Sequence, residues 1–154
     1  MLIYKSGDLL KSDCTVVMHQ ANCQKTMGAG IAKAISKMYP GAYLVDKNSN
    51  LSPEERFGTF THYTSKDNGV TVVNLYGQLH FGRGGNFTNY DKLESAIDSF
   101  LSYAKDNKNE IDLSKVGVPY KIGSGLAGGD WKVVNNLIEK QSKKHRVNIY
   151  IYKM

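Results

Sequence analysis

The sequence predicts an α/β fold: a three-layer α/β/α sandwich around a mixed, mainly parallel central sheet. Short β-forming runs alternate with segments of helical periodicity along the 154 residues. Two of the runs, at residues 14–20 and 115–120, are mostly apolar, which is typical of strands buried inside a parallel sheet. The chain length and the absence of a linker predict a single domain, residues 1–154.

Six strands are expected from runs rich in β-branched and aromatic residues. They occupy residues 2–5, 14–20, 57–64, 69–78, 115–120 and 147–154. Their interleaving with helices indicates crossover connections, so a ligand is expected in the crevice beyond the carboxyl ends of the strands.

Four helical segments are expected between these strands. The first follows a Gly-x-Gly pair and is expected to end at the Pro-Gly pair 40–41. Its apolar stripe consists of Ile31, Ala34, Ile35 and Met38. A short turn starts at Ser52, three residues before Glu55, as in a capping box. The two longer helices are expected at residues 90–107 and from Trp131 to about 143, the latter capped by Asp130.

The composition is that of a globular protein of the cytoplasm. No apolar run approaches the roughly 18 residues that cross a bilayer, and the N-terminus lacks the pattern of a signal peptide. Cys14 and Cys23 have no zinc-ligand spacing, so reduced thiols and metal-independent chemistry are expected. The net charge of +6, from 20 basic against 14 acidic residues, favours an acidic partner. The one dense basic cluster, residues 140–146, is either a solvated helix end or a nucleic-acid patch.

Two glycine-rich segments leave an apolar strand and enter a helix. One is "HQANCQKTMGAGIA" from His19, and the other is "IGSGLAGGDW" from Ile122. Glycine lets backbone N–H groups turn toward a phosphate, and a helix N-terminus adds partial positive charge. Two such segments predict a ligand with two phosphates, or with a phosphate and a sugar. The alternative is that the glycines only make tight turns.

Five stretches together resemble the macro domain family, in the family's order and over essentially the whole chain. They are "YKSGDLLKSDCTVVMHQANCQKTMGAGIAKAISKMYP", "NLYGQLHFG", "TNYDKLESAI", "VPYKIGSGLAGGDW" and "VNIYIYKM". The resemblance implies a three-layer α/β/α fold that binds ADP-ribose, and many members hydrolyse ADP-ribose derivatives. The chain looks similar to the branch with the ADP-ribose 1″-phosphate phosphatase and the terminal ADP-ribose protein glycohydrolase.

The resemblance also implies roles for individual residues. Asp8, with Leu9 beside it, would accept the adenine amino group, although an acid after Gly7 also caps turns. Asn22 would bind the distal ribose or else support its own turn. The diphosphate would lie between Gly28, Ala29, Gly30 and Ile31 on one side and Ser124, Gly125, Leu126 and Ala127 on the other. Tyr152 would contact adenine, or else belong to the core.

Two residues are the candidates for catalysis. His19 ends the strand that feeds the first glycine segment, as a histidine does in the phosphatase-like relatives. It would move a proton or stabilise a phosphate, or it would be a structural histidine that orients the loop. Asp130 would position or deprotonate a water molecule, or it would only cap its helix, and one carboxylate can serve both purposes.

The chain departs from the glycohydrolase branch at two positions. That branch uses a lysine that forms a covalent adduct and an aspartate right after Gly-x-Gly-Leu. Here Ala127 stands at the aspartate's place, and the lysine's region reads "YGQLHFG". Gln78, His80 and Arg83 make this third segment polar, suited to a terminal phosphate or to a supporting role, or the loop is simply mobile.

These observations predict a monomeric macro domain that binds ADP-ribose and hydrolyses a 1″ derivative, above all ADP-ribose 1″-phosphate. No cofactor, metal or membrane partner is expected. The alternatives are a non-catalytic reader of ADP-ribose and a hydrolase that removes ADP-ribose from protein or nucleic acid. Whether the loop from Leu79 to Tyr90 closes over the ligand is left open.

Overall fold

One six-stranded sheet forms the centre of the molecule, in the strand order β1-β6-β5-β2-β4-β3. The computed structural model describes residues 1–82 and 84–154. The strands are β1 (Leu2–Ser6), β2 (Val16–Asn22), β3 (Phe60–Thr64), β4 (Thr71–Gln78), β5 (Val116–Pro119) and β6 (Ile149–Lys153). All neighbouring strands pair in parallel except β3, which runs antiparallel to β4. The predicted mixed, mainly parallel sheet is therefore confirmed.

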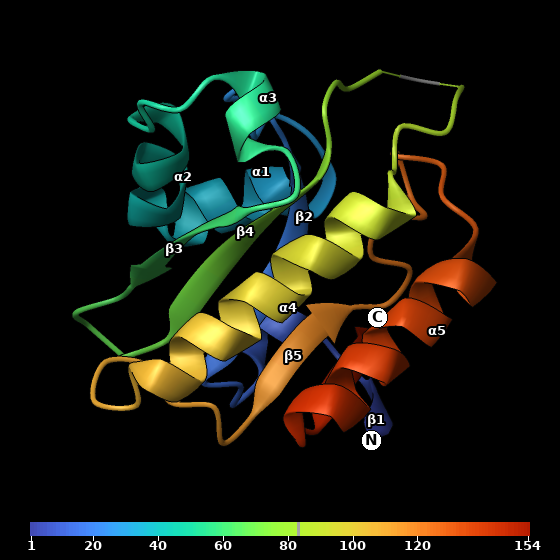
Figure 1. Cartoon of the computed structure of the whole chain (residues 1–154). Helices are drawn as coiled ribbons and strands as arrows, with labels where there is room; N and C mark the ends of the chain where they lie inside the picture. Colours follow the sequence, from blue (N-terminus) through green and yellow to red (C-terminus); the bar gives the residue numbers. More distant parts are fainter. Residues whose placement is uncertain (83) are drawn as a thin grey trace.

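Helices cover both faces of this sheet and complete the three predicted layers (Figure 1). Helices α4 (Tyr90–Asp106) and α5 (Trp131–His145) pack together against one face. Helices α1 (Gly30–Met38) and α2 (Pro40–Lys47) cover β2, β3 and β4 on the other face. Two short helices, the 3₁₀ turn η1 (Leu9–Lys11) and α3 (Pro53–Arg56), lie in the connections.

The alternation of side chains along β2 divides the core into two parts. Val16 and Met18 join the large cluster under α4 and α5. Val17 points to the opposite face, where it packs with Leu9 and Cys14. Because successive side chains of a strand point to opposite faces, β2 must be apolar on both sides.

The segment after α1 differs from the prediction. Pro40 does not lead into a loop but is the first residue of α2. Proline has no N–H to donate, and the first position of a helix needs none, so proline can start a helix as well as stop one. The predicted apolar stripe of α1 is also only partly buried: Ile35 is fully buried, whereas Ala34 and Met38 are exposed.

Side chains cap two helices as predicted. Ser52 Oγ accepts from the backbone N–H of Glu55, whose carboxylate accepts from the N–H of Ser52. Asp130 Oδ1 accepts from the N–H of Lys132 at 2.9 Å. None of the described helices is long and apolar enough to span a bilayer.

Candidate functional site

A cavity of about 820 Å³ opens beyond the carboxyl ends of β2, β4 and β5. This is the edge at which ligands bind in parallel α/β sheets. Three segments supply most of its wall: the first glycine loop (residues 22–30), the second glycine loop (residues 120–129) and the third loop (residues 79–89). Of the predicted ligand-binding residues, Asn22, residues 28–31 and residues 125–127 line it.

The first glycine loop presents the uncapped N-terminus of α1 to the cavity. Ala29 is the N-cap and has no side-chain acceptor, and hydrogen bonding inside the helix begins with Lys33 N to Ala29 O. Gly30, Ile31 and Ala32 all line the cavity. Their N–H groups belong to the first turn, which has no intrahelical acceptors. This wall is therefore suited to an anion.

The second glycine loop is a series of tight turns that faces the first. Ser124 N donates to Lys121 O at 2.8 Å, and Gly129 N donates to Gly123 O at 2.9 Å. A Cβ on Gly30 would lie 3.6 Å from Leu126 Cδ1, so the two loops come close across the cavity. Ser124 itself does not line the cavity, and its buried Oγ has no hydrogen-bond partner among the described residues.

A glutamine pair ties the three loops together at the base of the cavity. Gln20 Nε2 donates to Gln78 Oε1 and to Thr88 Oγ1, each at 2.9 Å. Thr88 Oγ1 donates in turn to Gly123 O at 2.6 Å. Sequence reasoning missed Gln20, although its position at the end of a buried strand, directly before a glycine loop, was a usable signal.

Asn22 supports its own turn while it lines the cavity. Its Oδ1 accepts from Gln24 N at 2.8 Å, and its Nδ2 donates to Thr26 O at 3.1 Å and to Thr26 Oγ1 at 3.0 Å. The amide thus holds the first glycine loop in shape, and Thr26 joins the cavity wall.

The predicted adenine-binding residues do not line this cavity. Asp8 caps η1 through Leu10 N at 3.0 Å, Leu9 is buried, and Tyr152 packs against the Leu9 cluster. Next to Tyr152, the cavity wall is formed instead by Tyr120 and Lys121, which the sequence analysis did not single out. Tyr120 N donates to Tyr152 O at 2.8 Å, so the lining aromatic is a direct neighbour of the predicted one.

His19, a predicted candidate for catalysis, lies in the interior of this fold. Its side chain is fully buried and does not line the cavity. Nε2 lies 2.6 Å from Asn74 Oδ1, and burial lowers the pKa of His19 to about 4. The structure thus shows how Asn74 holds the imidazole, whereas a chemical function of His19 stays a prediction.

Asp130 lies directly after the second glycine loop but outside the cavity wall. It is exposed, one carboxylate oxygen caps α5, and its backbone N–H donates to Tyr90 Oη at 2.9 Å. Its capping function is therefore visible in the structure, whereas its chemical function stays a prediction.

Two titratable side chains line the described part of the cavity wall, those of Tyr120 and Lys121. Lys121 Nζ lies 5.7 Å from the centre of the Tyr120 ring, within the range of a cation–π contact. His80 is exposed and does not line the wall, although its neighbour Phe81 does. Arg83, the third polar residue predicted for this loop, lies outside the described residues. No group of three or more His, Cys, Asp or Glu side chains in the described ranges could hold a metal ion.

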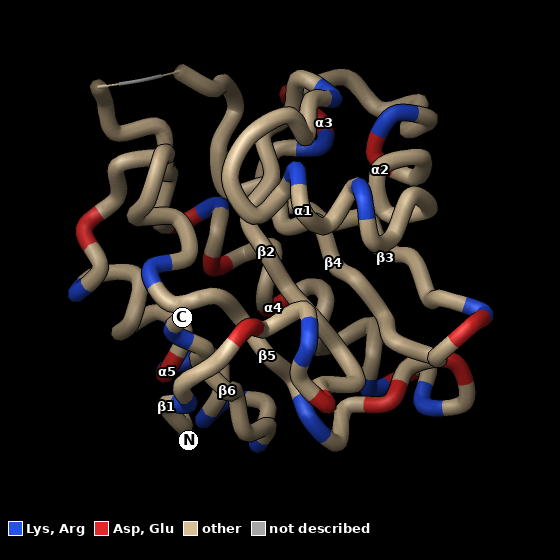
Figure 2. Tube along the Cα trace, turned by 180° about the vertical axis from the view of Figure 1, so that it is seen from behind, with Lys and Arg blue, Asp and Glu red and all other residues tan. Residues whose placement is uncertain are grey.

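The basic cluster at residues 140–146 is neutralised in part by acidic neighbours. Lys140 pairs with Glu94, Lys143 with Glu139, and Lys144 with Asp98. Figure 2 shows basic and acidic positions interspersed along the trace. The cluster therefore fits a solvated helix end better than a nucleic-acid patch.

The chain is similar to known proteins in sequence and in structure. The family described as Macro domain matches residues 18–138. A protein of Debaryomyces hansenii named ADP-ribose 1″-phosphate phosphatase is 26% identical over 180 residues, which cover 98% of this chain and 99% of that protein. A protein of Mycobacterium bovis named DNA ADP-ribosyl glycohydrolase is 28% identical over 155 residues, which cover 99% of this chain but 42% of that protein.

The solved structures agree at the level of the fold. The macrodomain of Mycobacterium tuberculosis DarG superposes with a TM-score of 0.79 over 100% of this chain and 98% of that one, at 22% identity.

Proposed function

The chain belongs to the macro domain family, and from this membership we propose that its cavity binds ADP-ribose and that the protein hydrolyses ADP-ribose 1″-phosphate. The observation that carries the proposal is a cavity that lies between two facing glycine loops. The first of these loops leads into α1, whose N-terminus has no side-chain cap. Its volume of about 820 Å³ lies in the usual range of small-molecule sites, roughly 300–1,000 Å³.

The proposed diphosphate position follows from the walls. Residues 28–31 supply first-turn N–H groups from one side, and residues 125–127 line the other side. Amides and a helix dipole stabilise phosphate oxygens. Asn22 and Gln78 would then face the distal ribose, and Tyr120 would face the adenosine half. Recognition of adenine by Asp8, Leu9 and Tyr152 stays a prediction, because it requires a ligand that extends beyond the cavity described above.

The proposed reaction is the transfer of a phosphoryl group to water. The water oxygen attacks phosphorus and loses a proton to the base, and the bond from phosphorus to the C1″ oxygen breaks. The C1″ oxygen takes a proton from solvent and the base returns its proton to solvent, which gives ADP-ribose and inorganic phosphate. Backbone N–H groups of the loops would stabilise the charge that develops on phosphate oxygens. Asp130, at the start of α5, is the proposed acceptor of the water proton, since His19 is enclosed.

The name of the Debaryomyces hansenii protein supports this substrate, because the alignment covers nearly all of both chains. The name of the Mycobacterium bovis protein supports a related alternative, the removal of ADP-ribose from DNA, over the part of that protein that aligns. The covalent lysine mechanism has no support here, because the segment in which the resemblance places that lysine, "YGQLHFG", contains none.

A second candidate function is non-catalytic recognition of ADP-ribose. One observation favours it: no carboxylate or imidazole lines the described part of the cavity, and Ala127 is in the wall at the place of the glycohydrolase aspartate. A reader needs only shape and hydrogen bonds, which the loops supply.

Three measurements test these functions. Titration calorimetry with ADP-ribose tests the binding site, and absence of heat at millimolar ligand would contradict both functions. Release of inorganic phosphate from ADP-ribose 1″-phosphate separates the hydrolase from the reader. An ADP-ribosylated oligonucleotide, followed by release of ADP-ribose, tests the DNA alternative in parallel.

A further inference from the structure

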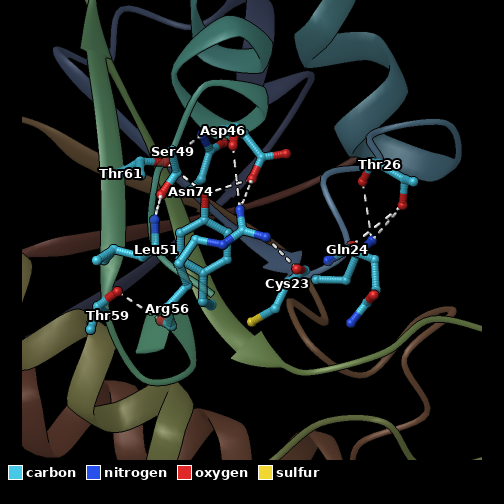
Figure 3. Close-up of polar contacts among 12 residues, drawn as sticks. Cys23, Gln24, Thr26, Asp46, Ser49, Leu51, Arg56, Thr59, Thr61 and Asn74 are labelled. Atoms are coloured by element: carbon cyan, nitrogen blue, oxygen red, sulfur yellow. Dashed lines mark hydrogen bonds and ion pairs between the residues drawn. The ribbon is translucent and has the colours of Figure 1, made fainter. Parts of the chain in front are cut away.

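A fully enclosed ion pair lies behind the first glycine loop (Figure 3). Arg56 of α3 and Asp46 of α2 have exposed fractions of 1% and 0%, and Arg56 Nη1 lies 3.0 Å from Asp46 Oδ1. Tyr76 of β4, also fully buried, donates from its hydroxyl to the same carboxylate oxygen at 2.6 Å. We call Arg56, Asp46 and Tyr76 the Arg56 cluster.

The second arm of the guanidinium reaches the first glycine loop. Arg56 Nη2 donates to the backbone carbonyl of Cys23, while Nη1 donates to Asp46 (Figure 3). Cys23 follows Asn22, whose side chain builds the turn to Thr26 and lines the cavity. The Arg56 side chain therefore links α2 and α3 to Cys23, the neighbour of the cavity-lining residue Asn22.

The hydrogen bonds behind the Arg56 cluster run in one direction. Because Tyr76 donates to Asp46, its hydroxyl accepts from Thr61 Oγ1 at 2.8 Å. Thr61 accepts from Asn74 Nδ2 at 3.0 Å, and Asn74 Oδ1 is left to accept from His19 Nε2. The donors from His19 to Tyr76 are thus each matched to an acceptor along this path, whereas Arg56 Nε, Asp46 Oδ2 and His19 Nδ1 are buried without a hydrogen-bond partner among the described residues.

Stability alone is a weak reason for such an arrangement. Removing two charges from water costs several kcal/mol per ion, and a buried pair regains this cost only with good geometry and further hydrogen bonds. The guanidinium is planar and offers donors in a fixed fork, so it can hold a carboxylate and a carbonyl at once. A lysine ammonium is a single point of charge on a flexible stem and cannot span both in this way.

We infer that Arg56 is a positioning residue of the cavity: it fixes the carbonyl of Cys23 and thereby holds the Asn22–Thr26 turn in the shape that binds ADP-ribose. The inference rests on the proposed function for the identity of the ligand. The shape of the turn itself can be measured without any ligand.

The test compares Arg56→Lys with Tyr76→Phe. The lysine variant keeps the positive charge beside Asp46 but cannot also hold the Cys23 carbonyl. The phenylalanine variant removes one donor to the same Asp46 oxygen and leaves the contact between Arg56 and Cys23 in place. It is therefore a matched control for a general loss of stability in this cluster.

Amide hydrogen exchange of the ligand-free proteins gives the first readout. Gln24 N–H donates to Asn22 Oδ1, and Cys23 N–H donates to Leu79 O. We expect exchange at residues 22–26 to rise at least about 10-fold in Arg56→Lys and to stay within about threefold of wild type in Tyr76→Phe. Equal exchange in the two variants, at similar melting temperatures, would overturn the inference.

Titration with ADP-ribose gives the second readout. Affinity is expected to fall at least about 10-fold in Arg56→Lys and less than about threefold in Tyr76→Phe. Equal losses of affinity in the two variants would count against positioning. If wild type fails to bind ADP-ribose, the proposed function fails, and the exchange comparison still decides on Arg56.

The inference can still be tested if the lysine variant does not fold. Should Arg56→Lys be unfolded, Tyr76→Phe and Asp46→Asn are compared, because both retain Arg56. Positioning requires wild-type exchange at residues 22–26 in both, despite lower melting temperatures. Exchange there that rises in step with the loss of stability would reject it.

Discussion

Nε2 of His19 lies 2.6 Å from Oδ1 of Asn74, its partner across the parallel pair of β2 and β4. Asn74 in turn donates to Ala42 O in α2 at 2.9 Å and to Thr61 Oγ1 in β3. The pair thus joins three strands and a helix in the interior. It explains why a histidine at the end of a strand that leads to a ligand loop need not be catalytic.

The burial of His19 predicts a stability that depends on pH. The unfolded chain takes up a proton at this residue as the pH falls through about 6.5, whereas the folded protein resists until about 4. The stabilisation is therefore fully present above 6.5 and is lost between 6.5 and 4. At 1.36 kcal/mol per unit of pKa, the loss amounts to about 3 kcal/mol.

Urea unfolding of wild type and His19→Gln between pH 7.5 and 4 measures this loss. Glutamine can donate to Asn74 but does not titrate. The unfolding free energy of His19→Gln should therefore fall less steeply than that of wild type as the pH drops from 7.5 to 4. Burial also lowers the pKa of His62, but His62 is present in both proteins and cancels in the difference. Identical pH profiles would show that His19 is not the responsible group.

Filling the space beside the second glycine loop should block the ligand without harming the fold. A Cβ on Gly125 would meet nothing within 4 Å, and its φ is not positive. In Gly125→Val the added side chain would occupy the proposed diphosphate position. We expect affinity for ADP-ribose to fall at least about 10-fold, with a melting temperature within about 2 °C of wild type.

Ser95→Val, on the exposed surface of α4, controls for an added β-branched side chain. Calorimetry and thermal unfolding of both variants check the prediction. Wild-type affinity in Gly125→Val would place the ligand elsewhere.

Contact between the second and third loops depends on Gly128. Its φ is +76°, and a Cβ there would lie 2.1 Å from Gly85 O and so collide with the backbone of the third loop. Phe87 N also donates to Ala127 O at 2.7 Å, so the loops are docked here. Gly128→Ala should destabilise the protein by about 2 kcal/mol or more, because strain and collision add, and should weaken ADP-ribose binding.

Gly69→Ala separates the two causes. Gly69 has nearly the same φ, +75°, but its Cβ would meet nothing within 4 Å. It should lose only about 1 kcal/mol of unfolding free energy and keep wild-type affinity. If the two variants lose equal stability in urea unfolding, the close approach of the loops is unimportant.

Replacing Asp130 by asparagine should separate its capping function from its chemistry. Asparagine caps a helix as well as aspartate does but cannot accept the proton of a water molecule. If Asp130 is the base, Asp130→Asn should release phosphate from ADP-ribose 1″-phosphate about 100-fold more slowly. Its melting temperature and ADP-ribose affinity should remain those of wild type.

Asp130→Ala completes the comparison, since it removes the cap as well and should cost about 1 kcal/mol in unfolding free energy. Full activity of Asp130→Asn would leave Asp130 with the cap alone and would contradict its assignment as the acceptor of the water proton.

The sequence by itself determined the architecture and the edge of the sheet at which the cavity lies. Hydrophobic periodicity gave all six strands, and local rules gave the caps at Ser52 and Asp130, because these features depend on residues close together in the chain. The two glycine loops could be recognised for the same reason, and strand polarity placed them at one edge of the sheet.

Only the tertiary structure decided the environment of single side chains. Whether His19 faced ligand or core depended on α2 and on Asn74, the latter 55 positions away. The pairing of Arg56 with Asp46 and with the Cys23 carbonyl likewise requires segments 10 and 33 positions apart to meet. Burial, and with it pKa and proton access, is set by what packs around a group, and no local pattern in the sequence records that packing.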